Sequence, residues 1–101
     1  MLEVKWSSLA EITLAEEIDF ILRKWNLVEA DKFVLLVYSF LEGLAKKPEI
    51  GIFNSKLNCF SIVISKQTTL YYRILESEKK VELVLFWNNK QNPTHLKKLL
   101  R

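Results

Sequence analysis

The chain begins with a strict alternation of apolar and charged residues. Leu2, Val4 and Trp6 are apolar, and the two residues between them, Glu3 and Lys5, are charged. Successive side chains of a strand point to opposite faces, so this pattern places the apolar residues on one face. We therefore predict a strand over residues 2–6 with one buried face.

Two longer segments with helical spacing follow. The first covers residues 8–25, and Ser8 with Glu11 forms a capping-box pattern at its start. The second covers residues 28–46, after Asn26, which tolerates a left-handed backbone. We predict an antiparallel helical hairpin. Its second helix faces the core with Ala30, Phe33, Val34, Val37, Leu41 and Leu44.

Other apolar residues of the second helix lie off this stripe. They are Leu35, Leu36, Tyr38 and Phe40. On a monomer they would leave apolar surface in water. We expect them to pack on a sheet, and the alternative is contact with a second copy of the chain or with a partner protein.

Three segments rich in β-branched and aromatic residues occupy positions 57–65, 69–75 and 81–87. Pro48 and Gly51 end the second helix and open a loop through residue 56. The connections between the three segments are of hairpin length, so we predict an antiparallel meander with one face against the helical hairpin.

The C-terminal part is predicted to be a turn followed by a short helix. The turn covers residues 88–93, and Thr94 caps a helix over residues 95–100. The expected fold class is α+β, with an N-terminal strand, a helical hairpin packed on an antiparallel meander, and a short C-terminal helix.

Alternation also assigns side chains to the two faces of the meander. We expect Tyr72 to point into the core. The opposite face would carry Cys59, Ser61, Val63, Tyr71, Arg73, Val84 and Phe86. That face is too apolar to be exposed only to solvent, and it suits the binding of a segment of a partner protein.

Length and composition limit the class of protein. The 101 residues are expected to form a single domain, 1–101, and half of them are hydrophobic. Cys59 is the only cysteine, which argues against a disulfide framework or a cysteine zinc site, so we expect a cytoplasmic protein with no metal or cofactor. Residues 1–6 contain no signal-peptide core, and the longest apolar run, 33–38, is too short to span a membrane.

The charge is divided unevenly along the chain. Residues 1–50 contain six Lys and Arg against nine Asp and Glu, or −3, whereas residues 51–101 contain nine against three, or +6. A basic half favours an anionic partner, either nucleic acid or an acidic protein segment. Solubility alone would explain the same charge.

Local strings of residues resemble the RelE/ParE toxin superfamily, and in particular its plasmid-stabilisation toxins. The strings follow one another in the order and spacing of that superfamily, and with the predicted elements they cover the whole chain. They are Val4-Lys5-Trp6-Ser7, Leu44-Ala45-Lys46-Lys47-Pro48-Glu49-Ile50-Gly51, Leu70-Tyr71-Tyr72-Arg73-Ile74 and Leu85-Phe86-Trp87-Asn88-Asn89-Lys90-Gln91-Asn92-Pro93.

The resemblance implies the toxin of a type II toxin–antitoxin module, neutralised by a cognate antitoxin. It also implies one of two activities, inhibition of DNA gyrase or cleavage of ribosome-bound messenger RNA. The nucleases of the superfamily carry basic residues on the meander, and residues 59–65 contain none. This departure puts gyrase-directed binding first. A degenerate member that only binds its antitoxin is a further alternative.

Candidate site residues follow from these two activities. A nuclease would use Arg73, Lys90 and His95, because the reaction needs an acid, a base and positive charge. Binding of the target or of a phosphate would involve Lys56, Lys66, Tyr71, Arg73 and Lys90. Simpler roles are an ion pair of Arg73 with Glu82 and solvated surface positions for the lysines and His95. The antitoxin would contact Ser61, Val63, Tyr71, Val84 and Phe86.

Overall fold

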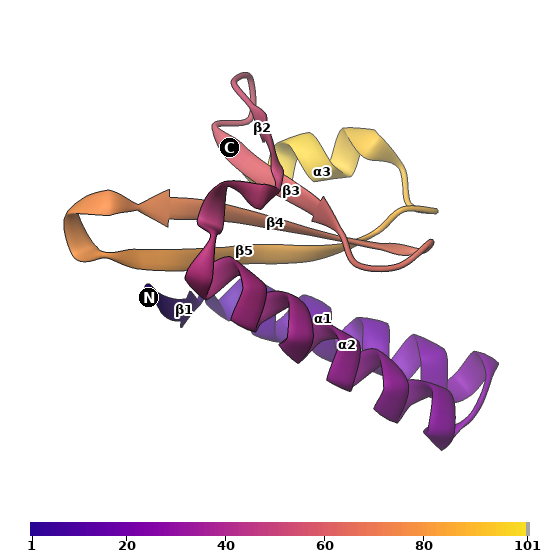
Figure 1. Cartoon of the computed structure of the whole chain (residues 1–101). Helices are drawn as coiled ribbons and strands as arrows, with labels where there is room; N and C mark the ends of the chain where they lie inside the picture. Colours follow the sequence, from indigo (N-terminus) through magenta and orange to yellow (C-terminus); the bar gives the residue numbers. More distant parts are fainter. Residues whose placement is uncertain (101) are drawn as a thin grey trace.

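The structure, a computed structural model, describes residues 1–100 as one mixed sheet with helices on both faces (Figure 1). The five strands lie in the order β1-β5-β4-β3-β2. No helix in the described part of the chain is long and apolar enough to cross a membrane. The elements are β1 (Glu3–Trp6), α1 (Ser8–Lys24), α2 (Leu27–Lys46), β2 (Ile52–Asn54), β3 (Cys59–Val63), β4 (Thr68–Leu75), β5 (Lys80–Asn88) and α3 (Pro93–Leu100), with short 3-10 turns at Pro48–Ile50 and Glu76–Glu78.

The predicted meander and helical hairpin are confirmed. Strands β3, β4 and β5 pair antiparallel in sequence order, and β1 joins β5 in parallel, with Val4 opposite Val81. The prediction of a loop after Gly51 is wrong, because β2 pairs antiparallel with β3. With three residues, β2 is too short to produce a recognisable alternation.

The residues that cap the two long helices differ from the sequence prediction. Ser7, not Ser8, caps α1, and its Oγ accepts a hydrogen bond of 2.9 Å from the amide of Ala10. Asn26 is extended rather than left-handed, and its Oδ1 accepts the amide of Glu29 at the start of α2. The predictions for Ser8 and Asn26 are therefore wrong. In both cases the side chain that can reach an otherwise unpaired amide of the first turn is the cap.

The C-terminal helix is confirmed, but its predicted cap is wrong. The amide of Thr94 donates to Oδ1 of Asn92, so Asn92 takes the place predicted for Thr94. Leu96 and Leu100 are buried, whereas Leu99 faces outward.

The main core lies between the helical hairpin and one face of the sheet. Phe33, Val37 and Leu44 of α2 belong to the same buried cluster as Leu70 and Leu83 of the sheet. The ring of Phe60 on β3 stacks on Tyr72, and Phe53 on the edge strand β2 packs against Phe60. Burial of this apolar surface is the main force that holds the hairpin on the sheet.

Tyr72 is fully buried in this core, as predicted. Its hydroxyl donates to the carbonyl of Pro48 at 2.7 Å and accepts the amide of Gly51 at 3.0 Å. A Cβ at Gly51 would lie 2.5 Å from that hydroxyl oxygen and 2.7 Å from the carbonyl oxygen of Ser61. Glycine is therefore needed at position 51 because the backbone passes directly over the phenol.

A bulge in β5 reverses the predicted faces of that strand's last part. Tyr71 lies opposite Leu85 and Tyr72 opposite Leu83, so Val84 is an extra residue between them. One extra residue shifts the alternation by one position. The outward placement predicted for Phe86 is wrong, because this side chain is 2% exposed and packs in the core beneath the helical hairpin.

The second face of the sheet is covered by α3 (Figure 1). Leu96 and Leu100 pack with Cys59, Leu85 and Trp87 in a second, smaller buried cluster. The face that the alternation leaves for a partner is therefore partly occupied by the chain's own last helix.

The off-stripe residues of α2 behave differently from one another. Phe40 is half-buried and packs against the core, as expected. Leu35, Leu36 and Tyr38 are exposed, with Leu35 at 71%, so their predicted packing on the sheet is wrong. Leu35 lies on the side of α2 opposite Phe33 and Val37. Leu36 instead borders a groove beside Phe33, and Tyr38 lies beside Trp6 and Leu41.

Candidate functional site

Arg73 holds two parts of the chain together on the α3 face of the sheet. Its Nε donates to the carbonyl of Asn58 at 3.1 Å, and its Nη2 donates to the carbonyl of Leu100 at 3.0 Å. Glu82 lies directly opposite on β5. The ion pairs found among residues 1–100 do not include one between Arg73 and Glu82. The guanidinium instead fixes the turn before β3 and the end of α3.

A cleft of about 450 Å³ opens beside Arg73. Three cationic side chains from three segments line it, namely Lys56 before β3, Arg73 of β4 and Lys97 of α3. The remaining lining residues are Leu57, Asn58 and Leu100. No carboxylate or imidazole lines this cleft within the described chain. Its chemistry suits the binding of a phosphate or carboxylate group.

Two titratable side chains lie in or beside the cluster under α3. Burial raises the pKa of the Cys59 thiol, against the opposing effect of the Arg73 charge. Burial also raises the pKa of the Tyr71 phenol. Both groups are therefore neutral near pH 7 and offer neither a thiolate nor a phenolate to a substrate.

The other predicted cations lie at the opposite end of the sheet. Thr68 pairs with Asn88 at that end, and Lys66 and Lys90 flank this pair in the adjoining loops. Arg73 lies five positions further along β4, a span of about 17 Å at the usual rise of a strand. The structure thus brings Arg73 near Lys56 and separates it from Lys66 and Lys90.

His95 is exposed in the first turn of α3, and its amide donates to the carbonyl of Asn92. It lies in the part of α3 that follows the Lys90 loop, whereas Arg73 binds the last residue of the same helix. His95 does not line the cleft beside Arg73. The three residues proposed for nuclease chemistry are not gathered at one place.

The predicted antitoxin surface is only partly accessible. Val63 is 62% exposed, and Ser61 and Tyr71 are half-buried. Val84 is buried under α3, and Phe86 lies in the opposite core. A partner can reach the β3 side of this surface without any change in the chain, but it cannot reach Phe86.

Two residues that shape these regions were not predicted from the sequence. Lys97 lines the cleft, and its position three residues before Leu100 would have placed both on the same side of a helix. Glu17 is 5% exposed, and it accepts hydrogen bonds from the Thr68 hydroxyl and from Nδ2 of Asn88. Glu17 lies four residues before Ile21, on the same side of the helix, and this spacing could have indicated that Glu17 is buried.

Comparison with known proteins identifies the family of the chain. The model of the ParE toxin of type II toxin–antitoxin systems, parDE, matches residues 4–93. No relative was found among curated protein sequences.

Solved structures share the fold at low sequence identity. A structure of the chromosomal ParDE toxin–antitoxin system from P. aeruginosa matches with a TM-score of 0.72 and 14% identity, over 87% of this chain and 96% of that one. The intact E. coli RelBE complex matches with a TM-score of 0.62 and 13% identity, over 90% and 100% of the two chains. A YoeB/ParE toxin from Agrobacterium tumefaciens matches with a TM-score of 0.63 and 13% identity, over 87% and 99%.

The match to the family model covers most of the chain, and the arrangement of the strands and helices agrees with these structures. The chain therefore belongs to the ParE toxin family of type II toxin–antitoxin systems.

Proposed function

We propose that this toxin arrests growth in the cytoplasm by binding to DNA gyrase, and that it does so without covalent chemistry on a nucleic acid. The observation that supports this proposal is the composition of the cleft beside Arg73. It gathers Lys56, Arg73 and Lys97 and has no carboxylate or imidazole in its described lining. Such a cleft binds an anionic group on a target.

Cleavage of RNA makes stronger demands on a site. One group must remove a proton from the 2′-hydroxyl, and another must protonate the leaving oxygen. Histidine is the side chain whose ordinary pKa suits both tasks near neutrality, and His95 lies outside the cleft. Arg73 already donates to two carbonyls of its own chain. Binding therefore agrees with the geometry better than catalysis does.

The test is the supercoiling of relaxed plasmid DNA by purified gyrase in the presence of the toxin. We expect inhibition at micromolar toxin. The double variant Lys56→Ala with Lys97→Ala should weaken it at least tenfold, since both cleft cations are removed. Lys98→Ala is the matched control, because Lys98 is exposed on α3 and does not line the cleft. Full supercoiling at micromolar excess of wild-type toxin would remove this mechanism.

A second candidate is a ribosome-dependent messenger RNA endonuclease. The observation that favours it is the set of three cations in the cleft, because their positive charge complements the negative charge of a phosphodiester. In a translation extract, primer extension would then show cleavage at the ribosomal A site, lost in Arg73→Ala or Lys90→Ala. Intact messenger RNA with wild-type toxin would eliminate this reading.

Neutralisation by a cognate antitoxin is part of the same proposal. Induced expression of the toxin should stop growth, and co-expression of the antitoxin encoded beside it should restore growth. Normal growth on induction without the antitoxin would instead indicate a degenerate member that retains only its antitoxin contact.

A further inference from the structure

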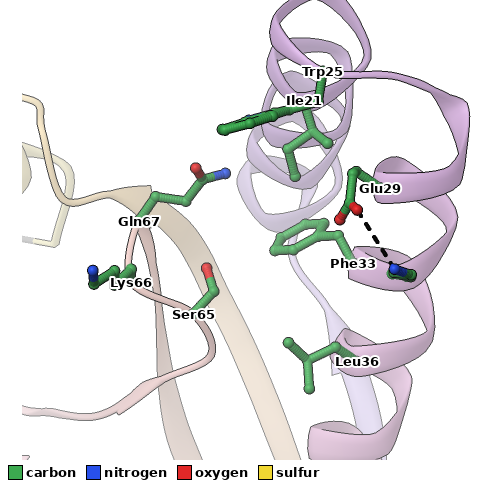
Figure 2. Close-up of a pocket in the computed structure, with 9 residues that line it drawn as sticks. Ile21, Trp25, Glu29, Phe33, Leu36, Ser65, Lys66 and Gln67 are labelled. Carbon is green, nitrogen blue, oxygen red and sulfur yellow. Dashed lines mark hydrogen bonds and ion pairs between the residues drawn. The ribbon is translucent and has the colours of Figure 1, made fainter.

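A groove of about 420 Å³ lies between the far end of the helical hairpin and the loop that joins β3 to β4 (Figure 2). Ile21 and Trp25 reach it from the α1 side, and Phe33, Leu36 and the ion pair of Glu29 with Lys32 reach it from α2. The loop contributes Ser65, Lys66 and Gln67. Figure 2 shows the ring of Trp25 extending over the groove towards Gln67. This groove is separate from the cleft beside Arg73.

The helical wall of the groove is apolar and partly exposed. Phe33 and Ile21 are buried at its base, whereas Trp25 is 61% exposed and Leu36 is 39% exposed. Burying one large apolar side chain is worth about 1.5–3 kcal/mol. A concave wall of this kind matches a bulky apolar side chain of a second molecule.

Ser65 presents an unpaired polar atom at the same place. Among the described residues, its Oγ is buried without any hydrogen-bond partner. In Figure 2 this oxygen points from the loop into the groove. An unpaired buried hydroxyl is unfavourable, and a carbonyl or carboxylate oxygen entering the groove would accept its proton.

Ammonium groups from separate segments lie in and beside the groove. Lys66 lines it, and Nζ of Lys24 lies 5.7 Å from the ring centroid of Trp25. The nearby Lys90 side chain lowers the pKa of Lys24, because two ammonium groups side by side disfavour each other's charge. Nδ2 of Asn89 donates to the carbonyl of Lys66 at 3.2 Å, which joins the loops of Lys66 and Lys90.

These ammonium groups have no carboxylate of their own. The ion pairs found within residues 1–100 are Arg23 with Asp19 and Lys32 with Glu29. Two like charges held side by side repel one another, and an anion between them removes the repulsion. The groove therefore combines an apolar pocket, an unpaired donor, a carboxylate that is already paired with Lys32, and further ammonium groups at its rim.

We propose that this groove is the docking site for an acidic segment of a partner protein. One bulky apolar side chain of the segment fills the space between Trp25 and Leu36. A backbone carbonyl accepts the Ser65 hydroxyl, and the segment's carboxylates lie over Lys24, Lys66 and Lys90. Nucleic acid is the less suitable occupant, because the depth of the groove is lined by aliphatic and aromatic side chains rather than by donors for bases or phosphates.

The identity of the partner rests on the proposed function. The antitoxin of the proposed function is the partner that we expect here, because the basic second half of this chain is the electrostatic complement of an acidic segment. The segment would then hold the hairpin and the β3–β4 loop together from outside.

The test uses the antitoxin encoded beside the toxin, purified and titrated into the toxin by calorimetry. Trp25→Ala and Lys66→Glu should each weaken binding at least tenfold, and the loss in Lys66→Glu should shrink at high salt. The matched controls are Phe53→Ala, an exposed aromatic of β2, and Lys98→Glu, and both should bind within twofold of wild type. All four side chains are exposed, and thermal melts by circular dichroism will show that each variant folds.

Two results would overturn the proposal. Val63→Glu could abolish antitoxin binding while Trp25→Ala leaves it intact, which would place the partner on the β3 side of the sheet. Alternatively, Lys66→Glu could lose the binding of a single-stranded RNA or duplex DNA oligonucleotide with unchanged affinity for the antitoxin, which would assign the rim to nucleic acid.

Growth assays separate this proposal from the toxic activity itself. Lys66→Glu toxin should arrest growth even when the antitoxin is co-expressed, whereas wild-type toxin should be neutralised. Neutralisation of both would count against the groove and leave the toxin activity in place. If neither protein arrests growth, the toxic activity is refuted, and the calorimetric comparison still decides the role of the groove.

Discussion

The cleft beside Arg73 and the groove beside Trp25 lie towards opposite ends of the sheet. They differ in whether their charged side chains find partners within the chain. In the cleft, Arg73 is bound by two carbonyls of its own chain, and α3 forms part of the wall. In the groove, neither a carboxylate partner for Lys66 nor a hydrogen-bond partner for the Ser65 hydroxyl is found among the described residues.

The difference lies in how much of each site is completed by the chain itself. The cleft is held in shape by charge-assisted hydrogen bonds, which are stronger than neutral ones. Within the described chain, the groove still lacks an acceptor for the Ser65 hydroxyl and a carboxylate for Lys66. Substitution of Arg73 should therefore affect stability, whereas substitutions at the rim of the groove should affect binding.

The largest effect on stability is expected at Glu17, which ties α1 to the end of the sheet beside the groove. Glu17→Ala would leave the buried donors of Thr68 and Asn88 without their acceptor, at a cost of about 2–3 kcal/mol in the free energy of unfolding. Urea denaturation measures it. Glu16→Ala, an exposed neighbour, is the control. Equal stability of the two variants would show that this network does not anchor the hairpin.

Arg73→Ala tests whether the cleft is held by its own backbone contacts. Loss of the donors to Asn58 and Leu100 should lower the free energy of unfolding by about 1.5–2.5 kcal/mol and loosen α3. Hydrogen exchange of the α3 amides should accelerate. The control is Arg23→Ala, which removes only an exposed ion pair with Asp19. Unchanged exchange in α3 would contradict the structural role of Arg73.

Asn58 tests the backbone at the edge of the cleft. Its φ is 52°, in the left-handed region that asparagine and glycine tolerate. Asn58→Ala should cost about 1 kcal/mol, whereas Asn58→Gly should leave thermal stability nearly unchanged. Equal melting temperatures for the two variants would argue against backbone strain at this position.

The smallest effect concerns the pH dependence contributed by Cys59. Burial raises the pKa of its thiol in the folded state, so the unfolded chain releases the proton at lower pH than the folded chain does. The folded state then binds more protons, and stability falls as the pH rises above the ordinary thiol value towards the folded one. Denaturation in reducing buffer at neutral and at alkaline pH should show a smaller fall in Cys59→Ala than in wild type. An identical fall would show that the thiol does not contribute.

Short-range patterns were sufficient for some elements and insufficient for others. The first strand, both long helices and the three strands of the meander followed from periodicity, and Tyr72 was assigned to the core by alternation alone. Phe86 was assigned to the wrong face, because an extra residue at Val84 shifts the alternation and leaves no mark in the local pattern. Strand β2 was missed because three residues contain too little periodicity.

Candidate site residues show the same limit. Arg73 and Lys56 were selected as basic residues and do lie together, whereas Lys90 and His95 were selected for the same reason and lie elsewhere. Residue type indicates which chemistry a side chain can perform. Proximity depends on strand register and on the path of the loops, which act over long sequence separations.

The sequence by itself determined the α+β class, the order of the elements, the toxin family and the excess of positive charge in the second half. Periodicity, capping residues and composition are local properties, and they are sufficient for those conclusions. Only the tertiary structure decided that α3 covers the second face of the sheet, that Arg73 binds its own backbone, and that Lys66 lines a groove beside Lys24 and the Lys90 loop. These features join residues far apart in the chain, and the packing that brings them together is fixed only when the whole core forms.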